Sequence, residues 1–68
     1  MGTVTIQVDG NNKTVSRADY IKAKTKTLLE FGYSTLTEDE VSKQLDNVLA
    51  GRPLNAIGMF IEGDVVKD

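Results

Sequence analysis

Residues 15–20 read Val15-Ser16-Arg17-Ala18-Asp19-Tyr20 and mark the start of a helix directly behind a strand. Ser16 precedes Asp19 by three residues, which is the spacing of a capping box, a pair of polar side chains that satisfies free amides of the first helical turn. Apolar residues flank this box on both sides and form a hydrophobic staple. The pattern predicts a helix over about residues 17–31, with Gly32 as its C-terminal stop.

The same pattern recurs at residues 36–41, which read Leu36-Thr37-Glu38-Asp39-Glu40-Val41. Thr37 takes the capping position, and the acids behind it suit the positive end of the helix dipole. Gly51 and Pro53 follow at the positions where helices commonly stop. A second helix is therefore expected over about residues 38–50.

A hairpin precedes the first helix. Apolar and polar residues alternate from Thr3 to Val8, which is typical of a half-buried strand. The next four residues, 9–12, are Asp, Gly, Asn and Asn, all of which favour turns. Residues 13–15 then return as a short second strand, so we predict a hairpin over about residues 3–15.

Residues 56–61 form a short, continuous apolar run bounded by Pro53 and by polar residues 62–64. Its length favours a strand that is buried on both faces. For Val65 and Val66, a strand stub and a frayed end are both left open. The predicted fold is α+β: a ββααβ domain in which a short antiparallel sheet packs against two helices.

The composition excludes most site chemistry. The chain has 68 residues, a net charge of -2, and no Cys, His or Trp. This length limits it to a single domain, residues 1–68. Disulfides, metal sites built on Cys or His, and catalysis by His or Cys are excluded. No calcium-loop or phosphate-loop motif is present. We expect no metal, no cofactor, no small-molecule substrate and no enzymatic activity, because so small a fold leaves little room for a cleft.

The small size also raises the expectation of a partner. A chain of this length hides only about 60% of its surface on folding, so a lone monomer is marginally stable. Neither disulfides nor metal sites built on Cys or His can stabilise this chain, so stabilisation by association with another chain is favoured. A short sheet also has edges that pair with a second copy or with another protein's strand.

The sequence favours a soluble protein that does not bind membranes. No apolar run approaches the length of a membrane span. The N-terminal residues lack the basic and apolar regions of a signal peptide. A cytoplasmic location is the default expectation from these two observations.

One face of helix 17–31 mixes aromatic side chains with a lysine. At 100° per residue Tyr20, Leu28 and Phe31 share an apolar arc, and Lys24 lies in its middle. Three interpretations stay open: the Lys24 stem packs and its ammonium reaches water, Lys24 stands beside an exposed aromatic patch, or it pairs with a buried carboxylate. Under the second interpretation the partner-binding residues are Tyr20, Lys24, Phe31 and Tyr33.

A basic cluster supports a different hypothesis. A helix-turn-helix is disfavoured, because the connection between the helices is long and the second helix begins with three acids. The sequence pI near 4.9 is also unlike that of most nucleic-acid-binding domains. A dimer that pairs two Lys-rich helix faces would still build a basic patch. The candidate nucleic-acid-binding residues are Lys13, Arg17, Lys22, Lys24 and Lys26.

The function that these observations favour is a non-enzymatic interaction module. We expect it to modulate or inhibit a partner protein by binding it, and to form a homodimer. A phage or mobile-element origin is a hypothesis that rests on small size alone. The alternative is a small DNA-binding regulator that uses the Lys-rich face of helix 17–31.

Overall fold

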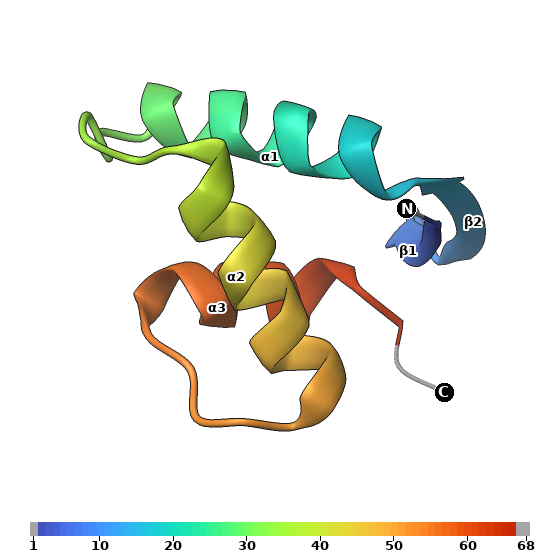
Figure 1. The fold of residues 1–68 in the computed structure, drawn as a ribbon. Coiled ribbons are helices and arrows are strands. Elements are labelled where there is room, and N and C mark those ends of the chain that lie inside the picture. Colours follow the sequence, from blue (N-terminus) through green and yellow to red (C-terminus); the bar gives the residue numbers. More distant parts are fainter. Residues whose placement is uncertain (1, 67–68) are drawn as a thin grey trace.

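The computed structural model of the chain describes residues 2–66. A two-stranded hairpin lies at one end of the first helix, and the other two helices pack together below that helix (Figure 1). This arrangement confirms the α+β class and the order of two antiparallel strands followed by helices. The elements are β1 (Thr3–Val8), β2 (Asn11–Ser16), α1 (Arg17–Glu30), α2 (Glu38–Ala50) and α3 (Ala56–Asp64).

The predicted hairpin is confirmed, with a tighter turn than expected. Strands β1 and β2 pair antiparallel, from Thr3 opposite Ser16 to Val8 opposite Asn11. The turn is made by Asp9 and Gly10 alone, whose φ angles are 51° and 82°. Two successive positive φ values are typical of the type I′ turn, whose twist matches that of the flanking strands. Because this turn needs only two residues, β2 begins at Asn11 rather than at residue 13.

The two capped helices are also confirmed. The Ser16 hydroxyl accepts a hydrogen bond from the Asp19 amide at 3.3 Å, and Thr37 accepts one from Glu40 at 3.3 Å. Helix α2 ends at Gly51, whose φ of 72° is a left-handed conformation that glycine adopts without steric cost.

The predicted strand at residues 56–61 is wrong, because this segment is helix α3. The Asn55 side chain caps it by accepting a hydrogen bond from the Gly58 amide at 2.9 Å. Ile57 and Ile61 are buried and Met59 is exposed, which is the four-residue spacing of a helix face rather than the alternation of a strand. A short apolar run does not separate the two structures by periodicity, and the Asn55 cap is the signal that decides.

Of the two alternatives left open for Val65 and Val66, the structure shows the strand stub, which lies directly behind α3. Val65 forms an isolated bridge with Ile6, and the Val66 amide donates to the Thr5 carbonyl at 2.8 Å. The sheet itself therefore has two strands, and three helices rather than two belong to the described fold.

The core lies where the three helices and the inner face of β1 meet. Leu28 from α1, Leu45 from α2 and Ile61 from α3 are fully buried. Helices α2 and α3 share the most extensive helix contact, at which Gly58 allows close approach to Gln44 and Leu54. The buried apolar side chains are Val4, Tyr20, Ile21, Leu28, Val41, Leu45, Val48, Ile57, Ile61 and Val65.

Candidate protein-interaction surface

Tyr20, Lys24 and Asp64 form a polar junction between α1 and the end of α3, here called the Asp64 junction. The Tyr20 hydroxyl donates a hydrogen bond to Oδ2 of Asp64 at 3.1 Å, and Lys24 Nζ lies 2.6 Å from the same oxygen. Burial raises the pKa of the Tyr20 hydroxyl far above its usual range, and the nearby Asp64 carboxylate adds to the shift. The junction therefore fastens the C-terminal end of α3 to α1.

This geometry corrects the predicted exposed aromatic patch at two of its residues. Tyr20 is only 7% exposed, so it is a core side chain and not a surface anchor. The Lys24 side chain is 14% exposed and pairs with a carboxylate as in the third of the three interpretations, although that carboxylate, on Asp64, is 39% exposed and not buried. The sequence pattern does not identify Asp64 as the residue that pairs with Lys24, because Asp64 comes near α1 only when residues 56–64 are helical.

Of the other two predicted residues, Tyr33 contacts α3, and Phe31 is exposed at the C-terminal end of α1. Phe31 is 73% exposed and follows Lys24 by two turns on the same side of α1. The half-buried Tyr33 ring packs edge-on against Phe60, with ring centroids 6.0 Å apart, and Lys24 Nζ lies 6.0 Å from the Phe60 centroid. We call Phe31, Tyr33, Met59 and Phe60 the aromatic surface.

Helix α3 contributes exposed residues to this surface that the sequence analysis does not predict. Met59 is 64% exposed and Phe60 is 44% exposed, and together with Ala56 they line an open apolar hollow. A strand buried on both faces would have hidden all three side chains. The signal available in the sequence was the Leu54-Asn55 pair with Met59 behind it, which repeats the cap and staple of the two earlier helices.

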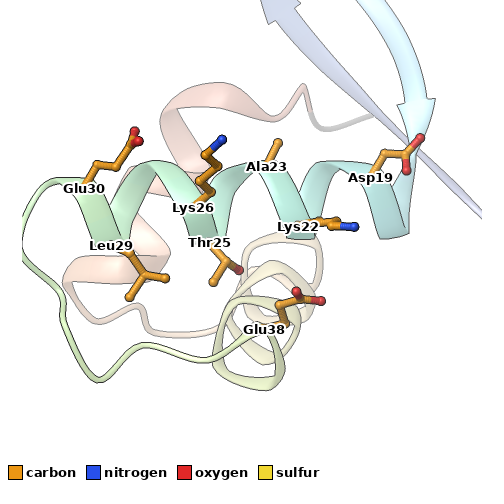
Figure 2. Close-up of a pocket in the computed structure, with 8 residues that line it drawn as sticks. All are labelled: Asp19, Lys22, Ala23, Thr25, Lys26, Leu29, Glu30 and Glu38. Carbon is orange, nitrogen blue, oxygen red and sulfur yellow. The ribbon is translucent and has the colours of Figure 1, made fainter.

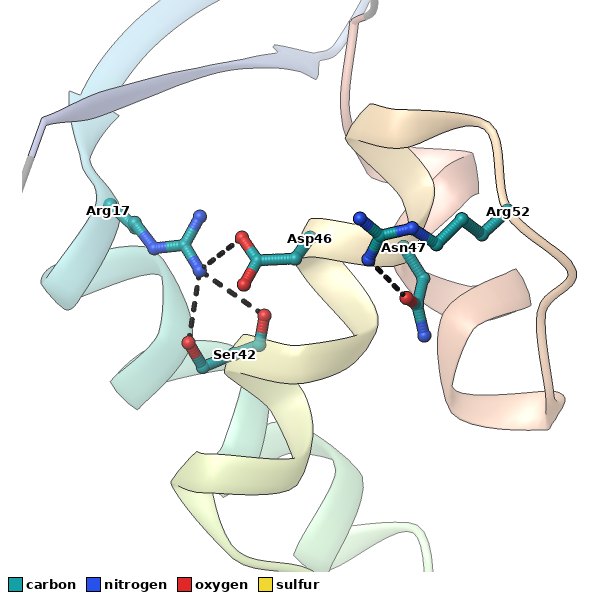
Figure 3. A network of polar contacts seen from close by, with 5 residues as sticks. All are labelled: Arg17, Ser42, Asp46, Asn47 and Arg52. Carbon is teal, nitrogen blue, oxygen red and sulfur yellow. Dashed lines mark hydrogen bonds and ion pairs between the residues drawn. The ribbon is translucent and has the colours of Figure 1, made fainter.

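Arg17, one of the five predicted nucleic-acid-binding residues, joins α1 to α2 instead. Its guanidinium lies 2.8 Å from Oδ1 of Asp46 and donates to the carbonyl and hydroxyl oxygens of Ser42 at 3.2 and 3.0 Å (Figure 3). On the far side of α2, Arg52 donates to the Asn47 side chain at 3.2 Å (Figure 3). Arg17 and Lys24 are thus both engaged in contacts between helices.

The three remaining basic residues do not form a uniformly positive surface. Lys13 is exposed on β2, away from the exposed Lys22 and Lys26 on α1. The α1 lysines border an open groove of about 570 Å³ that also carries three acids (Figure 2). The groove is lined by Asp19, Lys22, Ala23, Thr25, Lys26, Leu29, Glu30 and Glu38. Its mixed charge is unlike the clustered basic footprint that phosphate binding requires.

Within residues 2–66 no group of three or more acidic side chains is placed to hold a metal ion. In the same part of the chain, no helix has both the length and the apolar character needed to cross a membrane. Comparisons of the chain with protein-family models, curated proteins and solved structures found no match.

Proposed function

We propose that the chain is a non-enzymatic module that binds another protein through the aromatic surface and modulates that protein by occupying its binding site. The observation that carries the proposal is the exposure of Met59 and Phe60 side by side on α3, and Phe31 is a further exposed aromatic residue at the C-terminal end of α1. Aromatic residues and methionine are enriched in the cores of protein interfaces and depleted from ordinary exposed surface.

The electrostatics of this surface support protein binding. Lys24 Nζ lies 6.0 Å from the centroid of the Phe60 ring, and its charge is already paired with that of Asp64 at 2.6 Å. A partner that covers Phe60 therefore does not have to desolvate a lone charge, which would oppose association. The ring contact between Tyr33 and Phe60 also fixes both side chains before binding, so less rotational freedom is lost on association.

The expected partner offers an apolar pocket or groove that accepts Met59 and Phe60 as neighbouring anchors from one helix. Such anchors account for most of the affinity in interfaces of this kind, and the polar residues around them exclude water. A regulatory or inhibitory effect follows if the partner uses the same pocket for another ligand.

The proposal is tested by capture of host proteins on immobilised Met59→Ser and Phe31→Ser variants beside the wild-type chain. Leu49→Ser is the matched control, because Leu49 is also an exposed apolar residue but lies on α2 outside the aromatic surface. We expect one protein to be captured by the wild type and by Leu49→Ser, and to be lost with Met59→Ser. Equal capture by all variants would contradict the assignment of this surface.

A further inference from the structure

The outer edge of β2 is an unpaired sheet edge. In the β1–β2 register the Arg17 amide donates to the Gly2 carbonyl, which fixes the alternation of hydrogen-bonded pairs along the hairpin. Residues 4, 6 and 8 of β1 then bond to residues 15, 13 and 11 of β2. The backbone groups of Asn12 and Thr14 consequently point away from β1, towards solvent, whereas the carbonyl of Ser16, the N-cap of α1, accepts the first hydrogen bond of that helix.

The two edges of the hairpin differ in how they are covered. On the β1 edge, the outward carbonyl of Thr5 accepts the Val66 amide at 2.8 Å, and Val65 bridges to Ile6. No described residue covers the β2 edge in this way, and five of the six β2 residues are exposed. A two-stranded sheet is marginally stable alone and gains from further strands. The partner that matches this edge is another extended strand.

The side chains next to the β2 edge are complementary to a second copy of the same edge. An antiparallel pair centred on Thr14 places Thr14 opposite its own copy, and places Lys13 of one chain opposite Val15 of the other. Val15 borders an apolar hollow of about 210 Å³ between the hairpin and α1, and Asp19 lies on the rim of that hollow. Within residues 2–66, neither Lys13 nor Asp19 takes part in an ion pair.

We propose that a second copy of the chain pairs antiparallel along β2, centred on Thr14, to form a four-stranded sheet. The stem of Lys13 from each copy covers the hollow beside Val15 of the other, and its ammonium pairs with Asp19 there. Each Thr14 amide donates to the Thr14 carbonyl of the other copy, so two symmetric backbone hydrogen bonds close the contact. This interface is separate from the aromatic surface, so either proposal stands or fails without the other.

The wild-type chain itself provides the first test. Sedimentation from ~20 µM to ~1 mM is expected to show a shift from monomer to dimer, since a contact of this size is weak. In a mixed sample of labelled and unlabelled chains, we expect a filtered NOE between Hα of Lys13 and Hα of Val15. These protons are ~6–7 Å apart along one strand but in close contact across the proposed pair.

Two sets of variants separate this interface from any other. Thr14→Pro removes an amide that makes no bond inside the monomer, and is expected to raise the dimer Kd roughly 30-fold, whereas Thr14→Ala keeps that amide and the dimer. Lys13→Glu and Asp19→Lys are each expected to raise the Kd roughly tenfold, and the double variant is expected to restore the dimer. The charge variants change exposed residues, so they report on pairing even where Thr14→Pro unfolds.

Three outcomes would overturn the proposal. The first is a chain that stays monomeric at ~1 mM, because even a weak edge pair associates at that concentration. The second is a dimer that is insensitive to both charge variants. The third is a dimer that is lost with Met59→Ser but kept with Lys13→Glu, which would assign self-association to the aromatic surface.

Discussion

Tyr20 and Phe31 belong to one apolar arc of α1, yet the first is 7% exposed and the second is 73% exposed. The difference comes from α3 and the residues behind it. Asp64 binds the Tyr20 hydroxyl and Val65 joins the core beside β1, so the N-terminal half of the arc is covered. Phe31 stands beyond Leu28 at the end of α1, where no described element covers it. Which residues on this face of α1 are buried therefore depends on how far α3 and the residues behind it extend along α1.

The largest expected effect comes from truncating the two rings of this arc. Tyr20→Ala is expected to lower the free energy of unfolding by about 3–4 kcal/mol, because it leaves a cavity and removes the hydrogen bond to Asp64, which keeps only its ion pair with Lys24. Phe31→Ala is expected to lower it by less than about 0.5 kcal/mol. Urea denaturation followed by circular dichroism measures both values. Similar losses for the two variants would mean that Phe31 is a core residue.

Two glycines of helix α3 provide the same comparison between a closely packed position and an open position on one helix. A Cβ at Gly58 would lie 3.0 Å from Leu54 and Gln44, whereas a Cβ at Gly63 would meet nothing within 4 Å. Gly58→Val is expected to lower the free energy of unfolding by about 1–3 kcal/mol through overpacking. Gly63→Ala is expected to raise it by up to about 1 kcal/mol, through helix propensity. Thermal unfolding of the two variants checks both signs, and a stabilised Gly58→Val would show that α2 and α3 pack loosely.

At the Asp64 junction, removing one charge of the ion pair is expected to lower the free energy of unfolding more than removing both charges. Asp64→Asn leaves the largely buried Lys24 without its counter-charge, and is expected to lower the free energy of unfolding by about 1–2 kcal/mol. Adding Lys24→Met to Asp64→Asn is expected to recover part of that loss. A double-mutant cycle in urea measures the coupling. Additive effects would show that the ion pair contributes nothing beyond its separate side chains.

The smallest effect concerns alkaline pH. The pKa of Tyr20 is raised in the folded chain, so the unfolded chain releases this proton first as the pH passes its ordinary value of about 10. The stability provided by neutral Tyr20 is complete below that pH and declines above it, by at most about 1.4 kcal/mol per pH unit. Tyr20→Phe should remove this part of the decline, as measured by urea unfolding at about pH 9 and 11. An unchanged decline would assign it to other groups.

The local signals in the sequence predicted the hairpin and the two capped helices correctly, because each depends on neighbouring residues. Ser16 and Thr37 bind amides three residues away, and the Asp9-Gly10 turn needs only the positive φ that these residues tolerate. The failure at residues 56–61 has a local cause as well. Its apolar residues are continuous, so their pattern does not separate a helix from a strand, whereas the cap residue Asn55 before the run favours a helix.

The candidate site was predicted less well than the fold, because it depends on what α3 covers. The apolar arc of helix 17–31 predicts Phe31, and Tyr33 is predicted from its position close behind that helix, but the apolar run at residues 56–61 wrongly predicts that Met59 and Phe60 are buried in a strand. Tyr20 and Lys24 were placed with Phe31 although they belong to the Asp64 junction. A helical periodicity shows which side chains share a face but not which of them a distant segment will contact.

The sequence by itself determined the positions of β1, α1 and α2 and the presence of β2, and it excluded chemistry that needs Cys or His. Those properties follow from side-chain chemistry and from hydrogen bonds between near neighbours. Only the tertiary structure decided that Lys24 pairs with Asp64, that Met59 and Phe60 face outwards, and that the β1 edge is covered while the β2 edge is open. These properties depend on contacts between residues that are far apart in the sequence. Lys24 and Asp64 are forty positions apart, and Ile6 and Val65 are nearly sixty positions apart. Such contacts form only when α3 packs across α1 and α2.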